Sequence, residues 1–472
     1  MADQAIGADP ASKIQDESDL KRSITGKLLF FYVLGDVLGS GIYVLIGSVA
    51  GAVGGAFWVA FGLGVTVATI TGLAYAELVT KYPQAAGAAL YVNKAFGKRP
   101  LTFLITFCML SASFAAAASL AQGFSDYFSQ VWSLPPALLI GLLFIVALAV
   151  VNFIGITESV VANVVMTVVE VSGLVIILAC GVIFVSEGKA NFHSLVEFHS
   201  EGNPIFAIIA GIALAFFAMT GFENAANVAE ETIDPKRTFP KALVGGMVVA
   251  GILYVLVAMT AALIVPVGTL AGSDAALLEV VKADVLPLPL ALITIVFAVI
   301  AMVAITNTCL VALVTQSRIL YGMAREDVVP GVFSKVHASR RSPWVALIFA
   351  AFVVGALLII AGQIAVGDPA PGEEKTTALE ILVNVTVVFT LFIYGMVIVA
   401  ALKLRGRDET EGSFKAWTPL LILGIIANAI LLIYVVVDDP TSLIWCAGLL
   451  AVGGLLFLLE RLFDKGNRRQ AA

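Results

Sequence analysis

The sequence LGDVLGSGIY, residues 34–43, lies in the middle of an apolar stretch that covers residues 28–50. Glycines and an aspartate interrupt this stretch, and a glycine inside a helix is about 1 kcal/mol less favourable than an alanine. A second interruption, FFAMTGFEN at residues 216–224, lies inside the apolar stretch 205–228. We therefore expect two long hydrophobic helices, each broken near its middle.

Further apolar stretches of spanning length surround these two. The 472 residues are 60% hydrophobic and 13% charged, with a mean hydropathy of +1.01. Soluble proteins average about 45–50% apolar and about 25% charged residues, so a water-soluble enzyme is excluded. In a bilayer such stretches can only be helices, because no water is present to satisfy the backbone. The stretches lie at residues 28–50, 55–79, 101–128, 135–154, 159–185, 205–228, 241–265, 287–323, 343–362, 378–402, 417–437 and 442–462. The expected fold is an all-α polytopic membrane protein with twelve transmembrane helices.

The distribution of lysine and arginine predicts the orientation of this chain. If the N-terminus is cytoplasmic and the helices alternate, all basic residues face the cytoplasm except Lys189, Lys282 and Lys375. Positive charge concentrates in cytoplasmic loops, so this partition supports both the helix count and the orientation. We expect a multi-pass protein of the cell membrane, in contact with lipid, with both termini in the cytoplasm.

Composition also argues against several functional classes. The net charge of −6 argues against a nucleic-acid partner. The four cysteines lie inside apolar runs and the three histidines lie in loops, so we expect no metal site, no cofactor and no enzymatic activity. The chain has no glycine-rich ATP-binding loop, so an ion gradient would have to drive any transport. An ion channel is disfavoured because no filter-like re-entrant segment is present.

The positions of the two interruptions favour a transporter. They fall in the first and sixth predicted helices, which are the first members of two successive sets of five. Broken helices at corresponding positions of two inverted halves are the best sequence indication of a transporter site. An unwound segment exposes N–H groups to an anion and carbonyl groups to a cation, and an amino acid carries both charges.

Four runs resemble those of amino acid–polyamine–organocation transporters. They are residues 35–43, residues 74–78 followed by Tyr82 and Pro83, residues 216–242 and residues 317–325. The resemblance implies a leucine-transporter-like fold with a five-plus-five inverted repeat. The implied parts are a cytoplasmic tail at residues 1–24, a transport core at 25–402 with repeats at 25–185 and 204–402, and helices 11 and 12 at 403–472.

The resemblance also implies a substrate site at the middle of the membrane, between helices 1, 3, 6 and 8. The glycine motif that holds the substrate carboxylate falls on Gly39, Ser40 and Gly41. The helix 6 segment whose carbonyls take the ammonium group falls on Phe217, Ala218, Met219 and Thr220, with Gly221 beside it.

The sequence departs from the family pattern at two places. The usual Pro-x-Ala-Gly-Gly-x-Tyr motif after helix 2 reads PQAAGAA at residues 83–89. In helix 5, Glu170 stands where some members place a lysine that substitutes for sodium. The coupling mechanism of those members therefore cannot be transferred to this chain.

Acidic residues inside membrane helices are functional candidates, because an ionised side chain there costs about 3 kcal/mol. Glu170 is a candidate proton carrier, sodium ligand or partner of a cationic substrate, or a structural acid. For Asp36 the alternatives are a coupling residue and a residue that stabilises the packing of the half-helix. For Glu223 they are a coupling residue and a residue that caps a half-helix. Glu77, at the cytoplasmic end of helix 2, is expected to be a gate or interface residue.

Polar residues on helix 8 complete the candidate site. Asn307 and Thr308 could coordinate a cation or face the substrate, although such side chains often bond only to their own helix. The leading hypothesis is a secondary active amino acid importer, a symporter coupled to protons, with sodium open as the coupling ion. The alternative is a carrier or exchanger of polyamines or other organic amines, in which Glu170 faces the cationic substrate.

Overall fold

A computed structural model describes residues 24–84, 87–154, 160–198, 203–229, 231–325, 329–338, 340, 342–365, 377–407 and 412–470. Apart from Ile24, the expected N-terminal tail lies outside these residues, as do Ala85 and Ala86 of the altered helix 2 motif. In the part of the chain that the structure describes, the regular structure is helical. The one β-type contact there is an isolated bridge between Ile24 and Thr232.

Eleven spans among the described residues are long and apolar enough to cross a membrane, if α1 and α2 are counted as one. Their bounds are α1 Gly26–Leu38 with α2 Gly41–Val53, α3 Trp58–Lys81, α5 Arg99–Ser129, α6 Ala137–Ile154, α7 Val160–Ser186, α9 Pro235–Ile264, α12 Leu290–Arg325, α13 Trp344–Ala365, α14 Ala378–Lys403, α15 Thr418–Asp438 and α16 Thr441–Gln470. Helix α8, Pro204–Phe217, is apolar but has only 14 residues. The predicted count of twelve requires α8 and the following short helix to form one broken span, and it stays a prediction.

Short helices connect the spans. They are α4 Gly87–Phe96, α10 Val267–Ala271 and α11 Ala276–Lys282, with the 3-10 turns η2 Gly55–Phe57, η3 Phe192–Val196, η4 Phe222–Val228 and η5 Gly331–Ser334. Helix α4 packs against α5 and α14, and α11 packs against α2 and α12.

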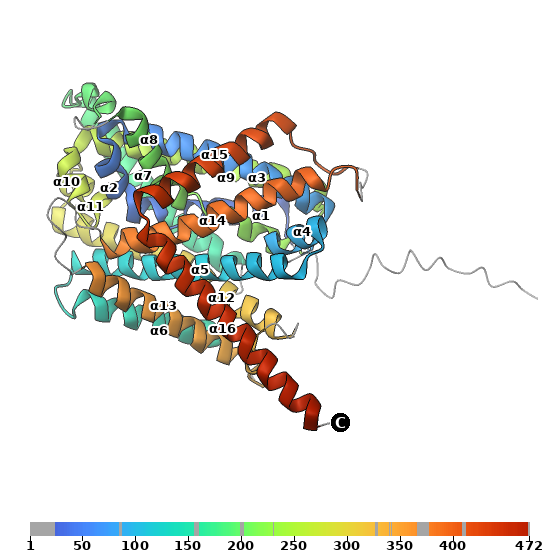
Figure 1. The fold of residues 1–472 in the computed structure, drawn as a ribbon. Coiled ribbons are helices and arrows are strands. Elements are labelled where there is room, and N and C mark those ends of the chain that lie inside the picture. Colours follow the sequence, from blue (N-terminus) through green and yellow to red (C-terminus); the bar gives the residue numbers. More distant parts are fainter. Residues whose placement is uncertain are drawn as a thin grey trace, which may run out of the picture.

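The long helices form two groups that pack side by side (Figure 1). The first group contains α1, α2, α3, α8 and α9, and the second contains α5, α6, α12 and α13. Helices α7 and α14 contact both groups, while α16 crosses the second group obliquely. The first two spans of each expected repeat thus lie in one group and the next two in the other. An inverted repeat would produce this distribution, and the repeat itself stays a prediction.

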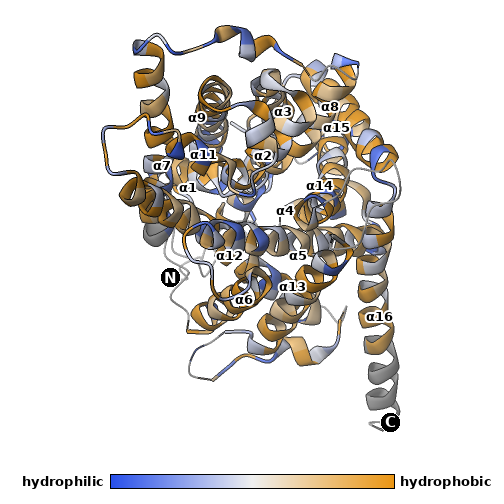
Figure 2. Cartoon of the chain, turned by 90° about the vertical axis from the view of Figure 1, so that its left-hand side faces the viewer, coloured by the Kyte–Doolittle hydropathy of each residue, from blue (hydrophilic) through white to orange (hydrophobic). Residues whose placement is uncertain are grey.

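The outer faces of the helices are apolar, as a lipid-facing surface requires. Figure 2 shows hydrophobic residues along the lengths of the helices and hydrophilic residues mainly in the connecting segments. Leu143, Val146 and Val150 on α6 are exposed, as are Ile430 and Ile433 on α15. Large apolar side chains in such numbers are stable only against lipid. The chain is a polytopic helical membrane protein.

Candidate substrate site at two broken helices

The first break separates α1 from α2. Helix α1 ends at Leu38 and α2 begins at Gly41, so Gly39 and Ser40 lie between them. The Ser40 N–H donates to Thr308 Oγ1 on α12 at 3.2 Å. The Ser40 hydroxyl is buried and has no hydrogen-bond partner among the described residues. The structure therefore contains the break that the sequence predicts, with one polar group available to a ligand.

The second break follows α8. This helix ends at Phe217, and the next turn, η4, begins at Phe222. Between them Gly221 has φ +118°, a conformation that residues with a side chain rarely adopt. The Thr220 hydroxyl donates to the Phe217 carbonyl at 2.8 Å. Ala218 and Met219 are buried beside it, so the whole predicted segment lies at the break.

The two breaks lie against each other. A methyl group added at Gly41 would stand 2.8 Å from Ala218 Cβ and would contact Ala218 Cα even more closely. A methyl group added at Gly221 would stand 2.5 Å from the Asp36 carbonyl oxygen. Only glycine permits these approaches. The N-terminal end of α2 and the C-terminal end of α8 therefore converge, and their partial charges are positive and negative respectively.

Tyr254 on α9 connects both breaks, and sequence reasoning did not identify it. Its hydroxyl lies 2.7 Å from the Val37 carbonyl, 2.6 Å from the Leu38 carbonyl and 3.2 Å from the Ala218 carbonyl. One hydroxyl proton can serve only one acceptor fully at a time. Tyr254 therefore holds the end of α1 and the end of α8 at a common point. The signal that could have found it is a tyrosine deep inside an apolar run, where its hydroxyl needs a partner.

Three acidic side chains lie near the breaks and differ in their hydrogen bonding. Glu223 accepts from the Gly221 N–H at 2.8 Å and from the Tyr394 hydroxyl at 2.6 Å. Asp36 is 4% exposed and is bonded by the Asn224 side chain, while its Oδ2 has no partner among the described residues. Glu223 thus has the hydrogen-bonded position expected of a residue that caps a half-helix.

Of the three acids, Glu170 on α7 has the fewest hydrogen bonds to its side chain. It is completely buried, and neither carboxylate oxygen has a hydrogen-bond partner within the described structure. The charged side chain within its electrostatic range there is another acid, Asp36. Tyr43 and Tyr254 also lie within its electrostatic range. An ionised carboxylate in this position would need a counter-charge or a proton, because burial of an uncompensated charge is strongly unfavourable.

The backbone around Glu170 is tied to the first broken span. The Tyr43 hydroxyl on α2 donates to the Glu170 carbonyl at 2.6 Å, and the Tyr127 hydroxyl on α5 donates to the Tyr43 carbonyl at 2.9 Å. All three residues are buried. A change at Glu170 can therefore be transmitted to α2 through one side chain.

The two candidate residues on α12, Asn307 and Thr308, contact different helices. Thr308 lies at the first break, where its hydroxyl accepts from Ser40 and lies 3.4 Å from the Ala304 carbonyl. Asn307 is 2% exposed and faces α7, where its side-chain oxygen accepts from Asn163 at 3.4 Å. Thr308 therefore borders the substrate candidates, whereas Asn307 lies at the contact between α7 and α12.

An aromatic cluster closes one side of the second break. The rings of Phe222 and Tyr394 lie 5.1 Å apart between centroids, and those of Tyr75 and Phe222 lie 5.6 Å apart. Phe216 contacts Tyr394 at 5.7 Å. Together with the hydrogen bond between Tyr394 and Glu223, these rings fill the space between η4, α3 and α14.

Comparison with known proteins gives a consistent result. The family profile described as "Amino acid permease" matches residues 25–451. The chain is 26% identical to the branched-chain amino acid permease BcaP of Bacillus subtilis, over 84% of each chain. It is 28% identical to the chloroplastic cationic amino acid transporter 9 of Arabidopsis thaliana, over 70% of this chain and 60% of that one. It is 26% identical to the methylthioribose transporter of Bacillus subtilis, over 71% and 75% respectively.

Proposed function

This chain belongs to the amino acid permease family, and from that premise we propose that it imports amino acids across the cell membrane by alternating access, coupled to protons. Family membership supports amino acid transport, and a permease is not an enzyme. The substrate site, the coupling ion and the orientation are the proposed parts.

The observation that carries the proposal is the contact between the two breaks. The substrate carboxylate would bind at Gly39, Ser40 and Gly41, where α2 begins and the end of the helix carries partial positive charge. Its binding would replace the hydrogen bonds that the Gly39 and Ser40 N–H groups donate to Gly35 and Thr308. The buried Ser40 hydroxyl supplies a further donor. The substrate ammonium would bind the carbonyl groups of residues 217–221, where α8 ends. The closeness of Gly41 and Ala218 brings the two charges of one α-amino acid within reach of both ends.

Coupling would depend on Glu170. A carboxyl group that is buried without a hydrogen-bond donor can bind one proton and release it when the surrounding helices move. Asp36 lies within electrostatic range of Glu170 and also adjoins the second break, which gives a physical connection between proton binding and the substrate site. The same change in proton binding would also alter the hydrogen bond between Ser40 and Thr308.

An amine carrier is the second candidate. The acids Asp36, Glu170 and Glu223 all lie near the breaks, and one of them could bind a positively charged side chain. Relatives named as cationic amino acid transporters occur among the matches. This candidate predicts a preference for lysine, arginine or polyamines over neutral amino acids.

Uptake into proteoliposomes distinguishes these functions. Radiolabelled leucine, lysine and putrescine would be offered with a proton gradient, a sodium gradient or neither. The proposal predicts accumulation of at least one amino acid under an inward proton gradient alone. Accumulation only with sodium would reject proton coupling, and uptake of putrescine without any amino acid would favour the amine carrier.

A further inference from the structure

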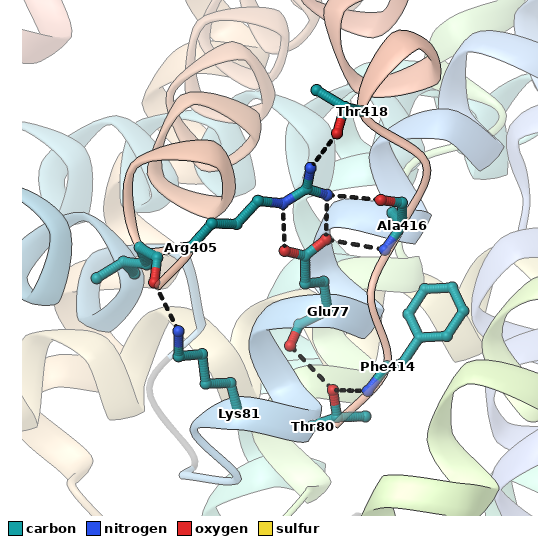
Figure 3. Close-up of polar contacts among 8 residues, drawn as sticks. Glu77, Thr80, Lys81, Arg405, Phe414, Ala416 and Thr418 are labelled. Carbon is teal, nitrogen blue, oxygen red and sulfur yellow. Dashed lines mark hydrogen bonds and ion pairs between the residues drawn. The ribbon is translucent and has the colours of Figure 1, made fainter. Parts of the chain in front are cut away.

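A polar cluster joins the end of α3 to the linker between α14 and α15 (Figure 3). The Arg405 guanidinium donates through Nε to Glu77 Oε1 at 2.8 Å and through Nη2 to Glu77 Oε2 at 2.7 Å. The two side chains are only 15% and 8% exposed. Two parallel bonds in a buried position distinguish this pair from an ordinary surface salt bridge.

The same guanidinium also holds the start of α15. It donates to the Thr418 hydroxyl at 2.5 Å and to the Ala416 carbonyl at 2.6 Å, while the Ala416 N–H donates back to Glu77 Oε2 at 2.9 Å. Arg405 and Glu77 thus share their hydrogen bonds with the residues that begin α15. Removal of either charge would leave the other without its counter-charge, with only the hydrogen bonds to Ala416 and Thr418 remaining.

Two neighbouring residues on α3 bind the linker independently. The Thr80 hydroxyl accepts from the Phe414 N–H at 3.0 Å, and Lys81 Nζ donates to the Leu404 carbonyl at 2.6 Å. Leu404 follows the end of α14, and Phe414 precedes the start of α15. Both described ends of the linker are therefore fastened to the last turn of α3 (Figure 3).

Helices α3 and α15 stay in contact further into the membrane. The Asn428 side chain donates to the Thr71 hydroxyl at 3.3 Å, and both residues are buried. A methyl group added at Gly424 would stand 2.7 Å from Ile70 Cγ2. Contacts at the end and along the length of the two helices resist both sliding and separation.

The final helix makes different contacts. Both α15 and α16 pack against α14 and they contact each other, but α15 also packs against α3 and α8 of the first group, whereas α16 packs against α5 of the second. Hydrogen bonds that the Arg405 guanidinium donates to Glu77 raise its pKa above the ordinary value, so no physiological pH removes its charge.

We propose that α15 moves as one rigid body with α3 and the first helix group during transport, while α16 stays with the second group. The inference rests on the proposed function, because it concerns motion in the transport cycle. It assigns the last two helices to different moving parts, with Glu77 and Arg405 as the residues that position α15.

A reversible cross-link tests this inference. Thr71→Cys and Asn428→Cys would be introduced together after replacement of Cys108, Cys180, Cys309 and Cys446 by alanine, and the folded protein would be treated with a short bis-methanethiosulfonate reagent. If α3 and α15 move together, the cross-linked protein should keep amino acid uptake within about twofold of the untreated protein. The matched controls are the two single-cysteine variants and the pair Ser113→Cys with Gln316→Cys, which joins α5 to α12 inside the second group.

Loss of uptake on cross-linking, with recovery after reduction, would overturn the inference, and so would failure of the Thr71 and Asn428 pair to cross-link. If the untreated protein takes up no amino acid, the proposed function fails instead. A double-mutant cycle of Glu77→Gln and Arg405→Lys on thermal unfolding needs no substrate and tests the attachment that the inference requires, the coupling between these two residues. The inference expects each single change to lower Tm by several degrees, with the double change costing little more. Independent, additive effects would contradict it.

Discussion

Glu170 is the residue on which the proposed coupling depends. It is completely buried, lacks hydrogen-bond donors within the described structure and lies within electrostatic range of Asp36. By contrast, Glu223 accepts two hydrogen bonds. Glu170 and Glu223 thus lie in the same region but in different environments. Of these two, only Glu170 lacks a group that would compensate its charge, so it needs a proton or a cation.

Replacement of Glu170 by glutamine should separate exchange from accumulation. Glu170→Gln keeps the shape of the side chain but fixes it in a neutral form. We expect the variant to bind and exchange substrate, while accumulation driven by an inward proton gradient falls at least tenfold, an order-of-magnitude expectation for loss of a proton-transfer group. Exchange and accumulation would be measured in the same proteoliposomes.

Glu223→Gln is the matched control, because its carboxyl group already has two hydrogen bonds, and it should affect accumulation and exchange alike. Wild-type accumulation by Glu170→Gln, with unchanged dependence on pH, would remove Glu170 from the coupling mechanism. Loss of binding only for ligands with a positive side chain would instead favour the amine carrier.

Gly41 tests the substrate site itself. In Gly41→Leu the new side chain would occupy the space against Ala218 where the two breaks meet, so substrate binding should be abolished. Gly362→Leu is the control, because a methyl group added there meets no atom within 4 Å. Binding would be measured by scintillation proximity on purified protein of equal yield. Undiminished binding by Gly41→Leu would show that this break is only a packing feature.

At the scale of elements, the broken helices depend on contacts that bring distant segments together. Tyr254 is separated from Val37 by 217 residues, yet its hydroxyl bonds to the end of α1. The same hydroxyl reaches Ala218 at the end of α8. One side chain on α9 thus fixes the relative position of the two half-helices that are proposed to bind the substrate.

Tyr254→Phe should weaken substrate binding without loss of the fold. A buried hydrogen bond contributes about 1 kcal/mol, so we expect a decrease in affinity of roughly fivefold. Tyr434→Phe is the control, since the Tyr434 hydroxyl bonds to Asp438 at an exposed position on α15. Equal affinities for Tyr254→Phe and wild type would mean that the two breaks are held in place by helix packing alone.

The elements were predictable from sequence where the signal is local. Glycine and polar residues at 34–43 and 216–224 predict both breaks, and apolar stretches predict the long helices. The partners of Tyr254 and Arg405 could not be identified in this way, because they lie far away in the chain. Arg405 and Glu77 are 328 residues apart, and only packing brings them together. Likewise, Asn307 and Thr308 are adjacent in sequence but face different helices.

At the scale of the whole molecule, the two groups of helices are the bodies that would move in alternating access. The breaks on α1 and α8 belong to the first group, while Thr308 belongs to the second. A substrate bound at the breaks would therefore lie at the boundary between the groups. This placement is typical of transporters in which one bundle moves against another around a fixed site.

The orientation can be tested by cysteine labelling in intact cells. The partition of basic residues predicts that cysteines at Ser200 and Gly372 react with an impermeant external reagent, whereas cysteines at Ser334 and Ser413 do not. Ser200 and Gly372 lie outside the described residues. Permeabilised cells are the control, in which all four positions should react. Labelling of Ser413→Cys from outside intact cells would contradict the twelve-helix topology.

The central claim is that the two charged ends of one amino acid bind the two broken helices. The most direct measurement is competition against uptake of the best radiolabelled amino acid by that amino acid, its amide and its N-acetyl derivative. The account predicts that the parent amino acid competes, while the amide, which lacks the carboxylate, and the acetylated form, which lacks the ammonium, are each at least tenfold weaker, as expected when a charged hydrogen-bonded contact is lost. If the amide or the N-acetyl derivative competed as well as the parent amino acid, one of the two breaks would not bind the substrate and the account would be contradicted.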